Sequence, residues 1–106
     1  MLDLPTGPTL AQFQEYVWSL ERERGFADQT LLEKCLLLGE EVGELFKSVR
    51  KQTGMSTEHN VQVSSVAEEL ADSFLMLLSV ANHAGVDLEQ AFRAKETKNE
   101  QRVWTK

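Results

Sequence analysis

Leu70-Ala-Asp-Ser-Phe-Leu-Met-Leu-Leu-Ser-Val-Ala81 is the stretch of sequence that decides the fold. Nine of its twelve residues are apolar, and only Asp72, Ser73 and Ser79 interrupt it, without the alternation of a half-buried strand. A helix that is apolar nearly all round is covered on most sides, either by neighbouring helices or at a subunit interface. Asp72 is therefore expected to have limited access to water, and such a carboxylate needs a partner.

Helix-start signals occur on both sides of this stretch. A Thr or Ser followed three residues later by Glu or Gln stands at Thr9, Thr30 and Ser65, and Asp87 precedes Gln90 in the same way. Together with helix-stopping glycines, these signals predict four helices, from Thr9 to Gly25, Thr30 to about Lys51, Ser65 to Gly85 and Asp87 to about Val103. Residues 1–8 are expected to be irregular and residues 52–64 to form a polar loop. The prediction is an all-α four-helix bundle, with residues 1–106 as one domain.

The composition is that of an ordinary globular protein with an acidic surface. The chain of 106 residues is 42% hydrophobic and carries a formal charge of −6, which disfavours binding to a nucleic acid polymer. Its beginning lacks a basic, apolar signal peptide, and nothing approaches the roughly 20 apolar residues of a membrane span. A cytoplasmic protein without membrane contact is therefore expected. Cys35, the single cysteine, is expected to be a small buried apolar residue.

Two pairs of carboxylates carry the chemistry. Glu41 and Glu44 are three residues apart, as are Glu69 and Asp72, so each pair shares one side of its helix. Two antiparallel helices meeting along these edges would gather four carboxylates, and such a cluster must protonate, spread out or bind a cation. Ligands that are all oxygen suit Mg²⁺, Mn²⁺ or Ca²⁺ rather than Zn²⁺. The alternative is that both pairs are solvated surface.

On the second helix, the main apolar stripe is predicted to place Glu41 at its edge. That stripe consists of Leu31, Cys35, Leu38, Val42, Leu45 and Val49.

The predicted fourth helix changes character along one face. This face begins with Leu88, Ala91 and Phe92, and at the same period it continues with Lys95, Lys98, Asn99 and Arg102. Either the helix runs past the end of the core into solvent, or its basic residues lean towards an anionic ligand such as a phosphate.

The acidic motifs resemble a known family. Gly39-Glu-Glu-Val-Gly-Glu-Leu45, followed by Glu69-Leu-Ala-Asp72, resembles the EExxE…ExxD signature of the MazG-like nucleotide pyrophosphohydrolases. These are related to the all-α dimeric dUTPases and to dCTP pyrophosphatase. The segment from Gly85 through Arg102 is similar to the closing helix of that family, and the resemblance covers roughly residues 26 to 104.

The resemblance implies an activity and a set of roles. The family hydrolyses a nucleoside triphosphate to the monophosphate and pyrophosphate with Mg²⁺, for which Mn²⁺ can stand in, and assembles as a homodimer or homotetramer with sites at the subunit interface. On the matching positions, Glu41, Glu44, Glu69 and Asp72 would hold the metal. Glu40 would orient the attacking water or hold a further metal, with Glu41 as the second catalytic carboxylate. Lys95, Asn99 and Arg102 would hold the triphosphate.

The base-binding residues are the least defined part of the expectation. Phe26 resembles an aromatic residue of the base site in the dCTP-preferring branch, and Trp18 is a second candidate for stacking, with a buried structural role as its alternative. A non-catalytic helical oligomer that only binds nucleotide or metal is the alternative function. A purely structural oligomer with a decorative acidic surface is another. The preferred base is left open, as is the choice between canonical and damaged nucleotides.

Overall fold

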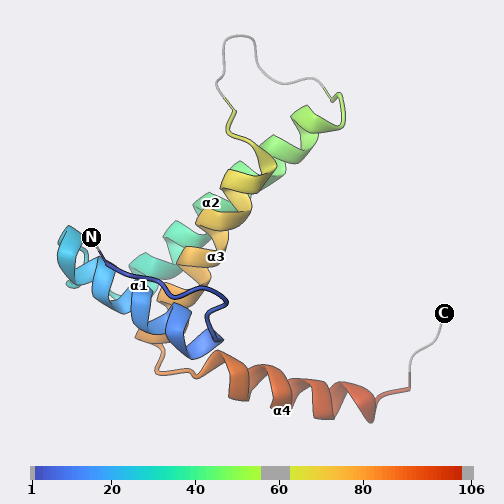
Figure 1. Ribbon diagram of the computed structural model, residues 1–106. Coiled ribbons are helices and arrows are strands. Elements are labelled where there is room, and N and C mark those ends of the chain that lie inside the picture. Colours follow the sequence, from blue (N-terminus) through green and yellow to red (C-terminus); the bar gives the residue numbers. More distant parts are fainter. Residues whose placement is uncertain (1, 56–62, 104–106) are drawn as a thin grey trace.

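All regular structure in the described part of the chain is helical. The computed structural model describes residues 2–55 and 63–103, and within them are α1 (Leu10–Arg24), α2 (Leu31–Gln52), α3 (Val66–His83) and α4 (Leu88–Glu100) (Figure 1). The predicted all-α fold class with four helices is confirmed. None of the described helices is long and apolar enough to cross a membrane.

Local side-chain bonds begin the helices where the sequence predicts. Thr9 and Thr30 each complete a capping box with the residue three positions further on. Ser65 and Asp87 each accept a hydrogen bond from the backbone N–H three positions further on. Gly25 ends α1 with a φ of 81°, in the left-handed region that favours glycine.

Two boundaries differ from the prediction. The fourth helix ends at Glu100, three residues before Val103, so its last predicted basic residue lies beyond the helix. Gln52, the first residue of the predicted polar loop over 52–64, is the last residue of α2. Residues 56–62 of that loop lie outside the described residues.

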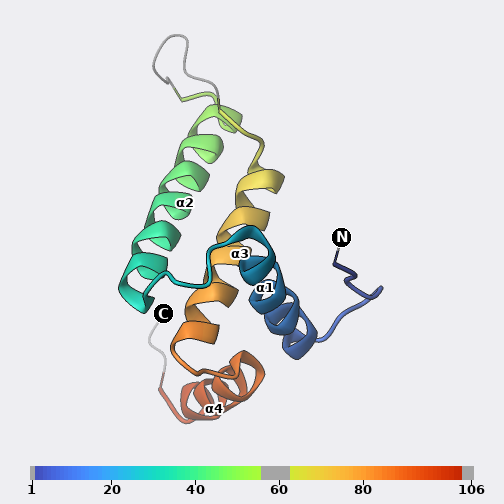
Figure 2. The ribbon, with the colours of Figure 1, turned by 90° about the vertical axis from the view of Figure 1, so that its left-hand side faces the viewer.

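A helical hairpin with a third helix across it forms the framework. α2 and α3 run antiparallel and side by side, and α1 packs against the lower half of α3 (Figures 1 and 2). Val17 and Leu20 of α1 and Leu78 of α3 form the buried core. Phe13 adds an edge-to-face contact with Phe74, with 5.2 Å between the ring centroids.

The last helix leaves this framework. α4 turns away from the hairpin and packs against α1 (Figure 2). Gln14 of α1 sets its starting direction, since its side chain donates to the carbonyl oxygen of Val86 at 2.8 Å and accepts from the backbone N–H of Leu88 at 3.0 Å. Gln14 is itself held by Asn82 of α3 through a bond of 3.0 Å.

Because α4 does not lie along the hairpin, α3 is less covered than predicted. Leu70 and Leu77 are 53% and 44% exposed in the single chain. The expectation that Asp72 has limited access to water is wrong for one chain, because the side chain is exposed. Cys35, expected to be buried, is exposed as well.

The inward face of α2 is also different from the prediction. Lys34 and Ser48 are its buried residues, and Glu41 lies half-buried between them. Of the predicted stripe, Leu38, Val42 and Leu45 are half-buried, whereas Leu31, Cys35 and Val49 are exposed, so the inward stripe is shifted towards Glu41. Glu41 therefore stands on the inward stripe rather than at its edge. The outward stripe, on the opposite side of α2, contains two glycines and three exposed apolar residues, namely Leu32, Leu36, Gly39, Gly43 and Phe46.

Candidate metal centre

The antiparallel pairing of α2 and α3 brings three of the predicted metal ligands together. Glu41, Glu69 and Asp72 each offer a carboxylate oxygen, and these three oxygens all lie within 4.8 Å of one another. Glu41 is half-buried, Glu69 is only 4% exposed and Asp72 is exposed. The cluster thus has a buried floor and an open side through which an ion and its ligands could enter.

The electrostatics of this cluster are unfavourable without a cation. Burial raises the pKa of Glu41 above its ordinary value, and the negative charges of Asp72 and Glu69 raise it further. Within the described residues, Oε2 of Glu69 is buried without a hydrogen-bond partner. A buried, unpaired carboxylate oxygen is costly, and a divalent cation would satisfy it. The donor set therefore fits a hard divalent metal.

Glu44 and Glu40 stand at the border of the cluster. Glu44 does not join the group of three oxygens; it is half-buried, and its carboxylate lies 3.9 Å from the ammonium group of Lys47. Glu40 is exposed on α2. Both nevertheless contribute to raising the pKa of Glu41, so their charges are close enough to act on the same site.

The predicted phosphate-binding residues are not joined to this cluster in a single chain. α4 runs away from the hairpin that holds the carboxylates (Figure 1). The predicted inward face of α4 is largely exposed, with Phe92 66% exposed, and Lys95 is exposed as well. Asn99 is half-buried and donates to Glu96 at 3.0 Å, whereas Arg102 lies beyond the end of the helix.

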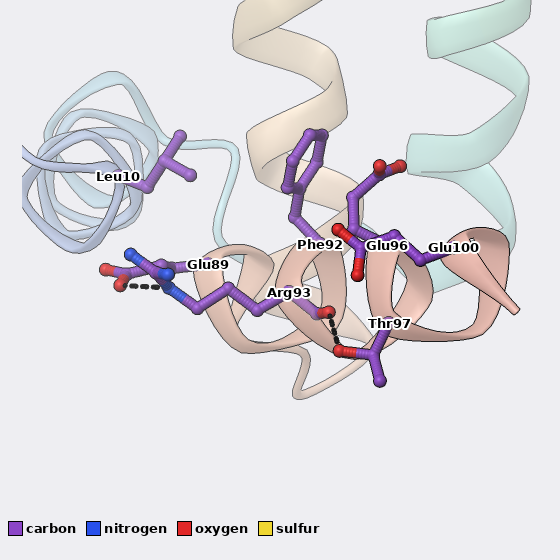
Figure 3. Close-up of a pocket in the computed structure, with 7 residues that line it drawn as sticks. All are labelled: Leu10, Glu89, Phe92, Arg93, Glu96, Thr97 and Glu100. Atoms are coloured by element: carbon purple, nitrogen blue, oxygen red, sulfur yellow. Dashed lines mark hydrogen bonds and ion pairs between the residues drawn. The ribbon is translucent and has the colours of Figure 1, made fainter.

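A cavity of about 480 Å³ lies between the start of α1 and the side of α4 (Figure 3). Its charged residues are Glu89, Arg93, Glu96 and Glu100, and the guanidinium of Arg93 is paired with Glu89 at 3.0 Å. The excess of carboxylates makes this cavity unsuitable for a triphosphate.

Phe26 lines a different cavity, which lies beside the carboxylates. This cavity has a volume of about 260 Å³ and is walled by Leu37 of α2 and Met76 of α3. These residues are four positions from Glu41 and Asp72 on the same helices, so the cavity begins about one turn, or 5.4 Å, from the cluster. Trp18 lines another cavity and carries the guanidinium of Arg22 at 4.1 Å above its ring.

Two residues of the Phe26 cavity were not predicted from the sequence. Lys34 and Glu21 are 2% and 4% exposed, and their charged groups lie 3.3 Å apart. Lys34 stands one helical turn before Leu38, on the inward stripe of α2. A charged residue at a position of this stripe is the sequence signal that could have identified it. Glu21 has the same signal, because it stands one helical turn after Val17 on the buried face of α1.

The comparisons agree with this architecture. The family model of the MazG nucleotide pyrophosphohydrolase domain matches residues 29–104. No curated protein matches the chain at a significant level.

Solved structures share the fold. The MazG-like pyrophosphohydrolase of cyanophage S-2L, solved with dGDP and three catalytic Mn²⁺ ions per active site, is similar with a TM-score of 0.72 and 24% identity. The match covers 96% of this chain and 88% of the phage protein.

iMazG from Vibrio DAT 722 is similar in two tagged forms. The N-tagged form has a TM-score of 0.65 and 28% identity, over 92% of this chain and 99% of iMazG. The C-tagged form has a TM-score of 0.63 and 30% identity, over 87% of this chain and 98% of iMazG. Because the family model spans most of the sequence, the chain belongs to the MazG nucleotide pyrophosphohydrolase family, whose members are hydrolases that act on the phosphoanhydride bonds of nucleotides.

Proposed function

We propose that this protein hydrolyses a nucleoside triphosphate to the monophosphate and pyrophosphate, with Mg²⁺ held by Glu41, Glu44, Glu69 and Asp72. The observation that carries the proposal is the convergence of three carboxylate oxygens within 4.8 Å, one of them from the buried Glu69. Mn²⁺ would serve in place of Mg²⁺, since both are hard cations that take oxygen ligands.

The carboxylates have distinct tasks in this reaction. A bound metal ion would neutralise phosphate charge and lower the pKa of a coordinated water. Glu69 would hold the ion from the buried side, and Asp72 and Glu41 would hold it from α3 and α2. Glu44 would join them by giving up its ion pair with Lys47, which is weak because both groups are half-exposed and 3.9 Å apart. Glu40 would orient the water that attacks the α-phosphorus while pyrophosphate leaves.

The related phage enzyme supports a role for all five acidic residues, namely Glu40, Glu41, Glu44, Glu69 and Asp72. That protein was solved with three catalytic Mn²⁺ ions per active site and a nucleoside diphosphate. Several ions need more oxygens than three carboxylates supply. If this chain binds the same number of ions, Glu40 and Glu44 would supply the additional oxygens, since both also raise the pKa of Glu41.

We further propose that the active protein is a homodimer or a homotetramer. The outward stripe of α2, together with Leu70 and Leu77 of α3, leaves large apolar side chains exposed in one chain. A second copy packed there would cover them. In the assembly that we propose, α4 of one chain, with Lys95, Asn99 and Arg102, lies near the carboxylates of the other, where these residues would hold the triphosphate.

Phe26 is proposed to stack on the base inside the cavity that adjoins the carboxylates. Leu37 and Met76 provide apolar walls on either side, one helical turn from the metal ligands. This places base and phosphates at neighbouring positions along the same hairpin. Trp18, which lines a different cavity, is the weaker candidate for this role.

The test is release of pyrophosphate from a panel of canonical and modified nucleoside triphosphates, with Mg²⁺ and with Mn²⁺. Glu69→Gln should abolish turnover, whereas Glu68→Gln, on the exposed neighbouring position of α3, should leave it nearly unchanged. Helicity measured by circular dichroism confirms that both variants fold. If the wild type binds Mn²⁺ and nucleotides but releases no pyrophosphate, the alternative of a non-catalytic binding protein replaces this proposal.

A further inference from the structure

We propose that Glu21, held in place by Lys34, selects nucleobases that carry an exocyclic amino group. The inference rests on the proposed function, because it assumes that the Phe26 cavity receives the base. It concerns two residues that neither the acidic motif nor the basic helix includes. Both line this cavity, and both are almost completely buried in the single chain.

The two oxygens of Glu21 have different surroundings. Oε2 lies 3.3 Å from the ammonium group of Lys34 and 3.9 Å from Nε2 of His83. Oε1 is buried and, among the described residues, has no hydrogen-bond partner. A buried acceptor without a donor is costly, so a ligand that brings an N–H group to Oε1 would gain more than one that does not.

The charge of this pair suits a neutral ring rather than a phosphate. Lys34 compensates the charge of Glu21 inside the protein, and its ammonium group also lies 5.8 Å from the centroid of the Phe26 ring. Arg24 also lines the cavity but is exposed, so its charge is solvated. The volume of about 260 Å³ lies below the roughly 300–1,000 Å³ of drug-sized ligand sites, which fits a single ring system.

The chemistry of the base edge then gives the selectivity. An amino group donates a hydrogen bond, whereas a keto oxygen at the same position is only an acceptor. Facing Oε1 of Glu21, a keto oxygen would meet a second acceptor and leave both groups unpaired. Two pairs of triphosphates differ at such a position, namely dCTP and dUTP, and dATP and dITP.

The experiment measures ratios of kcat/KM within these pairs for the wild type and for Glu21→Gln. We expect the wild type to favour the amino member of at least one pair, and Glu21→Gln to lower that ratio by about 10–100-fold, because an amide can offer its NH₂ group to the keto base. Because both triphosphates of a pair are measured on the same preparation, the ratio of their kcat/KM values does not depend on the fraction of the protein that is active. Glu23→Gln, on an exposed position of α1, is the control and should keep the ratio of the wild type.

A second variant separates a loss of base selectivity from a loss of folding. Glu21→Gln alone leaves Lys34 buried without its partner, so Glu21→Gln/Lys34→Met removes both charges together. This variant should also lose the preference for the amino base. Binding of dCMP against dUMP, and of dAMP against dIMP, gives the same ratios without turnover. If triphosphates are not hydrolysed, the proposed function fails while these binding ratios still decide the present inference. Equal ratios in the wild type and Glu21→Gln, or a wild type without preference for any amino base, would overturn it.

Discussion

Glu41 shows how the metal centre conflicts with the stability of the metal-free chain. Its carboxylate lies half-buried on the inward stripe of α2, and its pKa is raised by burial and by the surrounding negative charges. A carboxylate whose pKa is higher in the folded than in the unfolded state contributes stability at acid pH. That contribution is lost as the pH rises through the folded-state value. At neutral pH the site is therefore strained unless a cation is bound.

Replacement of Glu41 by Gln should expose this conflict. Without metal and at neutral pH, Glu41→Gln is expected to melt a few degrees higher than the wild type, where about 4–8 °C corresponds to 1 kcal/mol for a domain of this size. The difference should shrink at acid pH, where Glu41 is protonated. With Mn²⁺ the order should reverse, because only the wild type gains binding free energy. Thermal melting with a chelator and with Mn²⁺ at both pH values measures all three effects.

Glu68→Gln is the matched control for this experiment, since Glu68 is an exposed carboxylate beside the cluster. It should show neither the gain without metal nor the loss with it. A Glu41→Gln protein that is no more stable than the wild type at neutral pH without metal would mean that the carboxylates relieve their repulsion in another way.

At the level of the helix, α2 presents two opposite faces with different tasks. The inward face carries Lys34, Glu41 and Ser48, and the outward stripe carries apolar residues with Gly39 and Gly43. Glycine within a helix costs about 1 kcal/mol relative to alanine. In a single chain, a Cβ atom added at Gly39 or at Gly43 would meet nothing within 4 Å, so the chain itself gives no reason for this cost. Close approach of a second copy to the outward stripe would provide a reason for glycine at these two positions.

The variant Gly43→Ala tests whether a second copy packs against the outward stripe. If the outward stripe is the subunit interface, the added methyl group should weaken self-association by at least tenfold, although it favours the isolated helix. Sedimentation equilibrium measures the dissociation constant. Lys51→Ala, on an exposed position near the end of α2, is the control. An unchanged dissociation constant together with a higher melting temperature would place the interface elsewhere.

For the whole molecule, the position of α4 determines how an active site can be completed. α4 leaves the hairpin and packs on α1, so the basic residues and the carboxylates of one chain are separated (Figures 1 and 2). In a symmetric dimer, each site could combine carboxylates of one chain with α4 of the other. Lys95→Ala should then lower kcat/KM by about one to two orders of magnitude, because a charge-assisted phosphate contact is lost.

Mixing the inactive variant Glu69→Gln with the impaired variant Lys95→Ala tests whether the site is shared. After Glu69→Gln and Lys95→Ala are unfolded and refolded together, half of the dimers would be mixed, and each mixed dimer would have one site with both residues intact. Pyrophosphate release should therefore recover to about a quarter of the wild-type rate for a dimer. No recovery, with mixed dimers demonstrated by mass spectrometry, would show that α4 serves the carboxylates of its own chain. Affinity for Mn²⁺ without nucleotide should be unchanged in Lys95→Ala.

The sequence by itself determined the features that depend on neighbours along the chain. Helix starts follow from hydrogen bonds between residues three positions apart, as at Thr9 and Thr30, and such bonds are written in the local sequence. The stop at Gly25 requires a left-handed φ that glycine adopts readily. The spacing of the acidic pairs also predicted that Glu41, Glu69 and Asp72 could meet, given two antiparallel helices.

Only the tertiary structure decided which faces of the helices meet. Apolar residues lie on both sides of α2, so periodicity alone could not fix how far the helix is rotated, and the inward face proved to centre on Lys34, Glu41 and Ser48. The burial of Glu21 depends on a charge from α2, and the direction of α4 depends on the bond between Gln14 and the carbonyl of Val86. These partners are distant in sequence, and their contacts exist only after the helices have packed.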